Sequence, residues 1–248
     1  GEAADGDQGP AESTAEAMRE TLERGLPELG VDPAVIPALE HFAGMMLERN
    51  KVMNLTAITE PRDVAALHLL DSLALLPLAG LEHERLVDVG CGAGFPGMPL
   101  AIVRPSLEVT LLDSQRKRID FLEEAREALG LENAVCVHGR AEEFAGEHRE
   151  RFDAAVSRAV AALPVLCELC LPLVKVGGRM LAMKSANSEE EINGAKGAVK
   201  LLGGRVEWVK DYQIPGTDVI HRVVCVRKVS ATPGKYPRRF ALIKKQPL

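Results

Sequence analysis

The chain has 248 residues, of which 46% are hydrophobic and only 4% aromatic, so alanine, leucine and valine supply most of its apolar mass. A chain of this length forms one large domain, or a domain with an extension, and buries enough surface to fold without disulfides. Its five cysteines lack the spacing of a disulfide framework, and neither a signal peptide nor a membrane-spanning apolar run is recognisable. We therefore expect a cytoplasmic protein with free thiols that does not enter a membrane.

The net charge of −6 argues against a nucleic-acid partner until its distribution is considered. Residues 1–34 contain nine acids and two bases, which leaves the rest of the chain slightly positive. The last 14 residues contain five bases and no acid. This asymmetry leaves room for a surface that binds phosphate.

The first third of the chain predicts a helical extension. Residues 1–13 are acidic, small and contain Gly and Pro, which predicts disorder. Helical patterns follow over residues 14–29, 34–49 and 61–76. We therefore assign residues 14–80 to a helical extension or lid.

Residues 81–230 predict an α/β domain, because short apolar strands alternate there with helical segments. A helix near 188–202 precedes the last two strands, which we expect to form a hairpin. The basic residues 231–248 form a separate C-terminal tail. The seven predicted strands are Leu86–Gly90, Glu108–Asp113, Ala134–His138, Phe152–Ser157, Arg179–Lys184, Arg205–Tyr212 and Arg222–Lys228.

Residues 88–97, with the sequence DVGCGAGFPG, form the strongest local motif. They follow a predicted strand and precede a helical segment, so the glycines allow a tight turn and the helix amides face a ligand. A dinucleotide fingerprint needs Gly or Ala in place of Phe95, and no Lys-Ser/Thr pair follows to make a P-loop. The spacing of Asp88, Gly90, Gly92 and Gly94 instead matches S-adenosylmethionine-dependent methyltransferases, with Asp88 suited to the cofactor's ammonium group.

Asp113 ends the second predicted strand, 25 residues after Asp88. A carboxylate at this place accepts hydrogen bonds from ribose hydroxyls in related folds, and ligands of open α/β sheets lie at the carboxyl ends of the strands. A strand-terminal aspartate is also a common helix cap, so neither feature is specific alone. The combination favours S-adenosylmethionine as the cofactor, with S-adenosylhomocysteine as the product.

Further segments, in the same order along the chain, resemble those of one family. They are Asn54-Leu55-Thr56, HLLDSL at residues 68–73, Leu112-Asp113-Ser114 with Lys117-Arg118, Arg140-Ala141-Glu142, Ser157-Arg158-Ala159 and Met183-Lys184. With the GFPG of residues 94–97, they make residues 34–240 similar to the bacterial 16S ribosomal RNA guanine-N7 methyltransferase G family, also called glucose-inhibited division protein B. The resemblance implies a Rossmann-like class I methyltransferase with a seven-stranded, mostly parallel sheet. It also implies that the target is guanine 527 of 16S rRNA, near the decoding site.

The resemblance implies the cofactor contacts as well. Gly90 and Phe95 would lie beside the cofactor, Asp113 would bind the ribose with Ser114 next to it, Ala141 and Glu142 would border the adenine, and Arg158 would lie near the methionine end. The chain departs from the family where Cys91 replaces Ser or Thr, where Ser185 replaces Gly, and where residues 240–243 lack a Gly/Pro pattern.

The chemistry of guanine N7 explains why no catalytic triad is needed. N7 has a lone pair and no proton to lose, so the enzyme has to position it and stabilise a purine that becomes cationic. An unstacked loop guanine is accessible, whereas a helical one is hidden in the deep groove of A-form RNA. The catalytic residues stay unassigned, with Arg158, Lys184 and Asp71 as candidates.

Each of these candidates has a plain structural alternative. Arg158 and Lys184 follow strands at the ligand edge, where a salt bridge or a solvated lysine is the alternative. Asp71 shares a helix face with His68, which a packing pair also explains. No further ligand spacing accompanies that pair, so we expect no metal site. The motif Cys167–Cys170 is interpreted as buried thiols.

Basic residues are the candidates for RNA contact, although a charged helix face is usually only solvated. The candidates are Arg116, Lys117, Arg118, Lys184, Arg222, Arg238 and Arg239. The predicted partner is 16S rRNA or the small ribosomal subunit, and the predicted state is a monomer.

Two alternatives stay open. A small-molecule or protein methyltransferase shares the fold, because fold alone does not choose the substrate, and an enclosed apolar pocket would favour it. The second alternative is a non-catalytic RNA-binding module with a relic glycine turn. The intact motif at residues 88–94 argues against the relic.

Overall fold

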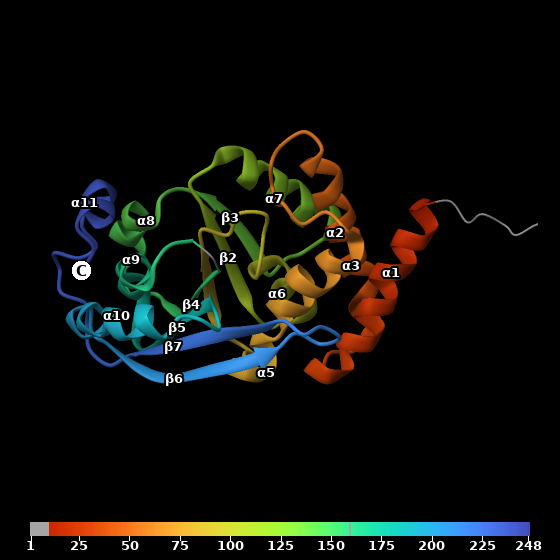
Figure 1. The fold of residues 1–248 in the computed structure, drawn as a ribbon. Helices are drawn as coiled ribbons and strands as arrows, with labels where there is room; N and C mark the ends of the chain where they lie inside the picture. The colour runs from red at the N-terminus through yellow and green to blue at the C-terminus, as the bar shows by residue number, and fades with distance from the viewer. Residues whose placement is uncertain (1–9, 159) are drawn as a thin grey trace, which may run out of the picture.

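The computed structural model describes residues 10–158 and 160–248, and its N-terminal part is helical (Figure 1). Helix α1 spans Pro10–Gly25, so it begins before residue 14, where the helical extension was predicted to start. Residues 1–9 lie outside the described residues. Short turns η1 (Pro27–Leu29) and η2 (Pro33–Val35) lead into helix α2 (Ile36–Asn50).

The predicted helix over 61–76 is present as one continuous run of turns. It consists of α3 (Pro61–Asp63), the π-helical segment η3 (Val64–Leu70) and α4 (Asp71–Leu73), and α5 (Leu75–Ala79) follows it. The wider π turns carry His68, and such turns occur frequently at functional sites.

The helical extension packs against the domain rather than standing apart from it. In α2 the buried residues recur every three or four positions, as an amphipathic helix requires. They share one apolar core with helices α6 (Gly97–Val103) and α7 (Arg116–Leu129), and Phe42 stacks on Phe121 with ring centroids 6.2 Å apart. The extension is therefore held over one face of the sheet, which fixes its position relative to the strand ends.

All seven predicted strands are present, in the order β3-β2-β1-β4-β5-β7-β6. Strands β1 to β5 are parallel, whereas β7 runs antiparallel to both β5 and β6, and β6 and β7 form the predicted hairpin at the sheet edge. Their bounds are β1 Arg85–Val89, β2 Glu108–Asp113, β3 Ala134–His138, β4 Phe152–Arg158, β5 Val174–Ser185, β6 Gly204–Gln213 and β7 Ile220–Lys228.

The second face of the sheet is covered by the later helices. These are α8 (Ala141–His148), α9 (Leu163–Cys170) with the turn η4 (Leu171–Leu173), α10 (Glu189–Leu201) and α11 (Phe240–Lys245). The strand order reverses between β1 and β4, and ligands of such sheets bind at this switch point, outside the carboxyl ends of the strands. Among the described residues, every helix is too short or too polar to cross a membrane.

Candidate active site

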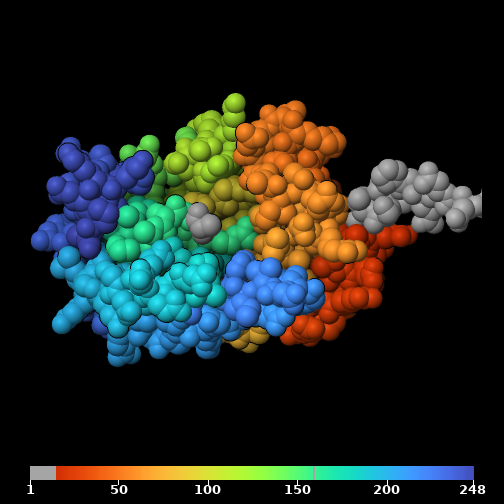
Figure 2. Space-filling view, viewed as in Figure 1, coloured from red at the N-terminus to blue at the C-terminus, as the bar shows by residue number. Residues whose placement is uncertain are grey.

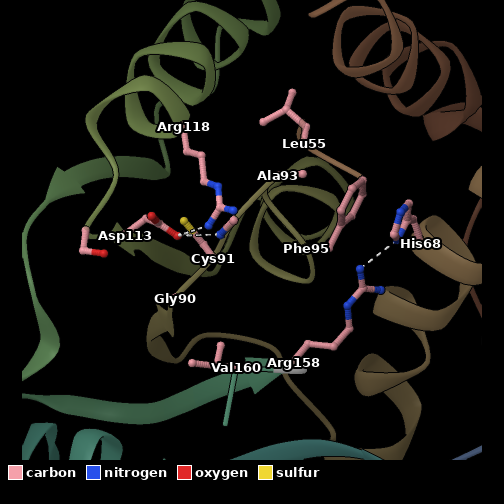
Figure 3. Close-up of a pocket in the computed structure, with 12 residues that line it drawn as sticks. Leu55, His68, Gly90, Cys91, Ala93, Phe95, Asp113, Arg118, Arg158 and Val160 are labelled. Atoms are coloured by element: carbon pink, nitrogen blue, oxygen red, sulfur yellow. Dashed lines mark hydrogen bonds and ion pairs between the residues drawn. The ribbon is translucent and has the colours of Figure 1, made fainter. Parts of the chain in front are cut away.

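Two adjoining cavities open where the parallel strands end. The first, of about 370 Å³, is lined by the glycine turn of residues 90–93 together with Phe95, Asp113, Ser114, Arg118 and Arg158 (Figure 3). The second, of about 150 Å³, continues toward β3 and is bordered by Ala141 and Glu142. Gly90, Asp113 and Ser114 line both cavities. The sequence motifs therefore meet in one place, although they come from distant parts of the chain.

The glycine turn owes its shape to positive backbone angles. Gly92 has φ of +55°, lines the first cavity and donates its N–H to Oδ2 of Asp113 over 2.9 Å. Gly94 has φ of +106°, and a Cβ there would lie 2.7 Å from Leu122. The cofactor prediction included both glycines, but Gly94 is absent from the lining of the described cavities and serves the packing of the turn against α7.

Asp88 lies beneath the turn and not in the cavity wall. Its carboxyl is fully buried, and Oδ2 accepts a hydrogen bond from Gly97 N–H over 2.8 Å. Oδ1 has no hydrogen-bond partner among the described residues, and burial raises the pKa of Asp88 to about 8. A ligand in the first cavity would therefore lie above the turn, and direct contact between Asp88 and an ammonium group would require the turn to move.

Asp113 lies where the glycine turn, the start of α7 and both cavities meet. Oδ1 accepts from Gln115 N–H over 2.8 Å, in the turn that leads into α7, while Oδ2 accepts from Gly92 N–H in the glycine turn. The same carboxylate lies 3.7 Å from Nη1 of Arg118 and lines both cavities. An acceptor at the mouth of a nucleoside-sized cleft suits ribose hydroxyls.

These residues fit the cofactor of the predicted class. The buried oxygen of Asp88 without a partner favours a cationic ligand above it, and Asp113 presents a carboxylate to sugar hydroxyls. The smaller cavity offers the apolar surfaces of Leu112, Ala141 and Leu169 to a flat base. Bound S-adenosylmethionine would supply an electrophilic methyl group on a sulfonium.

Arg158, at the end of β4, forms the far wall of the first cavity. Its Nη2 lies 2.7 Å from Nδ1 of His68, and its guanidinium lies 5.3 Å from the ring centroid of Phe95 (Figure 3). The His68 ring stacks on Phe95 with centroids 4.4 Å apart. Burial, helped by the charge of Arg158, lowers the pKa of His68 to about 4, so this imidazole is neutral.

A third cavity, of about 550 Å³, lies on the other side of Arg158 and His68. Its polar centre is Asp71, only 2% exposed, which accepts hydrogen bonds from the Tyr212 hydroxyl and, over 3.0 Å, from Nδ1 of His221. Asp71 also lies 3.4 Å from Nη1 of Arg158. The hydrogen bond to Asp71 raises the pKa of His221, which favours a cationic imidazole on the cavity wall.

Tyr212 and His221 were not among the predicted site residues. They face each other across the hairpin of β6 and β7, in register, and the hairpin loop borders the helical extension (Figure 2). Of the catalytic candidates, Arg158 and Asp71 come together here. Lys184 also lines the third cavity, but its Nζ donates to the Ala161 carbonyl over 2.6 Å and pairs with Glu191 over 3.1 Å.

Two RNA candidates are engaged inside the protein. Arg222 is buried, with its guanidinium between Asp211 (2.6 Å) and Glu189 (3.1 Å). Arg238 pairs with the fully buried Glu168 over 2.7 Å. Both guanidinium groups are paired with carboxylates, which gives them a structural role, and their contact with a phosphate stays a prediction.

The remaining RNA candidates are placed differently. Arg116 and Lys117 are exposed at the start of α7, and Arg239 is exposed at the start of α11. Arg118 is half-buried beside Asp113 and belongs to the cofactor cavity. The described residues contain no cluster of three His, Cys, Asp or Glu side chains that would hold a metal ion.

Comparison with protein families gives a match of residues 35–219 to the family described as rRNA small subunit methyltransferase G. Ribosomal RNA small subunit methyltransferase G of Alkaliphilus metalliredigens is 45% identical over 92% of this chain and 97% of its own length. The protein of the same name from Pelotomaculum thermopropionicum is 46% identical over 93% of this chain and 99% of its own. The chain belongs to this family.

Membership of the methyltransferase G family confirms the predicted family, the enzyme class and S-adenosylmethionine as the cofactor. Solved structures confirm the predicted fold class. TrmN from Thermus thermophilus superimposes with a TM-score of 0.50 at 21% identity, covering 64% of this chain and 48% of its own. A mutant of MtNAS gives a TM-score of 0.53 at 16% identity, covering 88% of this chain and 86% of its own.

Proposed function

We propose that this methyltransferase G transfers the methyl group of S-adenosylmethionine to N7 of a loop guanine in 16S rRNA, guanine 527 by the resemblance of its motifs. The supporting observation is the shared wall of two cavities. Arg158 and His68 line both the cavity with the glycine turn and the third cavity on their other side. A donor in the first cavity and a base in the third would meet at this wall.

The third cavity suits a purine that gains positive charge. When N7 forms its bond to the methyl carbon, the carbon–sulfur bond breaks with its electron pair on sulfur, and the positive charge moves to the base. Asp71 brings a carboxylate to this cavity, and its negative charge is held in place by Tyr212, His221 and Arg158. A preorganised charge of this kind favours the cationic product without any proton transfer.

His221 and Lys184 supply donors for the oxygen beside N7. Both line the third cavity, and the imidazole of His221 is one-third exposed. A guanine carries a carbonyl oxygen next to N7, whereas an adenine carries an amino group there. Cationic donors in this wall would therefore accept guanine and reject adenine.

The test is methylation of 16S rRNA from cells that lack the protein, offered both as free RNA and within the small subunit. We expect one methyl group on a single guanine, detected by mass mapping and by cleavage chemistry specific for N7-methylguanine. An RNA with 7-deazaguanine at that position is the matched control, because it lacks only the nucleophile. Equal incorporation into the deaza RNA would refute transfer to N7.

A cytoplasmic location and a monomeric state stay predictions.

A further inference from the structure

The basic tail predicted for residues 231–248 packs against the domain. Arg149 donates to the carbonyl oxygens of Thr232 over 2.8 Å and Tyr236 over 2.6 Å. Next to them, the backbone N–H and the guanidinium of Arg238 both bond to Glu168 on α9, each over 2.7 Å. These bonds fix the direction in which the chain enters α11.

The entry into α11 places Phe240, the first residue of this helix, at the smaller cavity. Its half-buried ring lines that cavity together with the segment Gly139–Glu142 that follows β3. The guanidinium of Arg140 lies 5.3 Å from the ring centroid of Phe240. Ile243, one turn later, is fully buried in the core that α8 and α9 share, and it holds the helix in place.

We propose that Phe240 closes the adenine end of the cofactor site, so that this part of the tail belongs to the cofactor site. This inference rests on the proposed placement of S-adenosylmethionine in the two adjoining cavities. The smaller cavity lies beyond Asp113 and Ser114, on the side away from Arg158, where the base of the cofactor is expected. An aromatic ring at its border offers a flat apolar surface to a purine.

Arg140 holds the ring of Phe240 in place. The guanidinium of Arg140 lies over the Phe240 ring and restrains the orientation of that ring. The aromatic wall is therefore held ready before a ligand arrives.

Calorimetry with S-adenosylhomocysteine tests the proposal without any catalytic step. We expect Phe240→Ala to weaken binding roughly 10-fold, as removal of a base-stacking aromatic does, and Phe240→Tyr to stay within about 3-fold of the parent. Leu242→Ala is the matched control, since it truncates the same helix at a residue outside the cavity lining, and we expect it to bind like the parent. Unchanged binding by Phe240→Ala would overturn the proposal.

A fluorescence experiment separates a contact with the base from mere support of the tail. The chain has one tryptophan, Trp208, so Phe240→Trp in a Trp208→Phe background places the only indole at the cavity. Saturable quenching by S-adenosylhomocysteine is expected, with a midpoint equal to the calorimetric one. Emission that does not change at saturation overturns the contact.

Gly92→Val distinguishes failure of this inference from failure of the cofactor placement. If Gly92→Val loses binding while Phe240→Ala keeps it, the cofactor placement stands and the role of the tail is wrong. If Gly92→Val binds like the parent, the cofactor does not use the glycine turn, and both proposals fail.

Discussion

Nη2 of Arg158 lies 2.7 Å from Nδ1 of His68, and this pair separates the cofactor cavity from the third cavity. A guanidinium only donates, so Nδ1 accepts, and the imidazole proton is on Nε2, which lies 2.8 Å from Oγ1 of Thr56. The tautomer of the neutral His68 ring is thus fixed by both neighbours. Arg158 keeps its full positive charge at the place where donor and base would meet.

Replacement of Arg158 is expected to affect methyl transfer more than folding. Arg158→Ala should lower the single-turnover rate on 16S rRNA roughly 100-fold, because it removes the preorganised guanidinium that orients Asp71 and His68 where donor and base would meet. Arg158→Lys should also be slow, since an ammonium cannot bridge both partners. The control is Arg126→Ala, which breaks a surface pair with Glu123 and should keep the parent rate. A parent-like rate in Arg158→Ala would remove this residue from the reaction.

The pH dependence of methylation should report on His221. Its hydrogen bond to Asp71 raises its pKa above 6.5, so the imidazolium is present below that raised pKa and loses its proton as the pH rises through it. Asp71, Arg158, Tyr212 and Lys184 also face this cavity. The pKa of His68 is lowered to about 4, so His68 does not titrate together with His221.

The wild-type single-turnover rate should therefore fall as the pH rises above 6.5 and His221 loses its proton, while His221→Gln should be slower and should lack this fall. The variant should also discriminate less strongly against an RNA with adenine in place of the target guanine. The same falling profile in His221→Gln would assign the titration to another group.

The part of the site that would bind the cofactor was largely predictable, because motifs within short stretches of the sequence encode it. A strand, a run of glycines and a second strand ending in Asp113 bring their residues to one sheet edge, whatever the rest of the chain does. Such motifs do not predict the direction in which a side chain points. Asp88 has the predicted spacing, but its carboxyl points under the turn, where Gly97 N–H binds it.

The other half of the site depends on long-range packing that no local pattern encodes. Tyr212 meets Asp71 from 141 residues away in the chain, through a hairpin that touches the helical extension. Likewise, Arg222 and Arg238 look like free cations in the sequence, and only the fold brings Asp211 and Glu168 to them. Strand β5 starts at Val174, earlier than predicted, because Val174 pairs with Phe152 across an irregularity in the register, where Gly178 closely approaches the Asp153 carbonyl.

The glycine turn allows a prediction with a matched control in the same chain. Gly92→Ala should weaken S-adenosylhomocysteine binding at least about 10-fold, because it adds a methyl group to the cavity wall at φ of +55°. Gly130→Ala carries the same kind of strain at φ of +63°, in open space at the end of α7. Calorimetry should show parent-like binding for Gly130→Ala, and both variants should melt at similarly lowered temperatures. Equal affinities for the two variants would mean that only backbone strain matters.

Asp88 should make the cofactor-free enzyme less stable as the pH rises. Its pKa is about 8 in the folded protein against 3.8 in an unfolded chain, so the stabilising neutral form is favoured at low pH and stability is lost as the pH rises toward 8. Asp88→Asn mimics the protonated carboxyl and removes this titration. The melting temperature of Asp88→Asn should therefore exceed that of the parent by a margin that grows from about pH 5 to pH 8, reaching at least about 3 °C, or roughly 1 kcal/mol. A constant margin would show that Asp88 is ionised throughout.

Two neighbouring arginines in the tail should have separate effects, Arg238 on stability and Arg239 on RNA binding. Arg238→Ala leaves Glu168 charged and fully buried, so unfolding should become easier by about 3–5 kcal/mol and the melting temperature should drop roughly 10 °C. Arg239 is exposed, so Arg239→Ala should melt like the parent. If Arg239 binds a phosphate, the slope of log affinity against log salt should become shallower by about 0.7–0.9. Melting curves and a salt titration of RNA binding measure both effects, and a stable Arg238→Ala with a shallower slope would return this residue to the RNA surface.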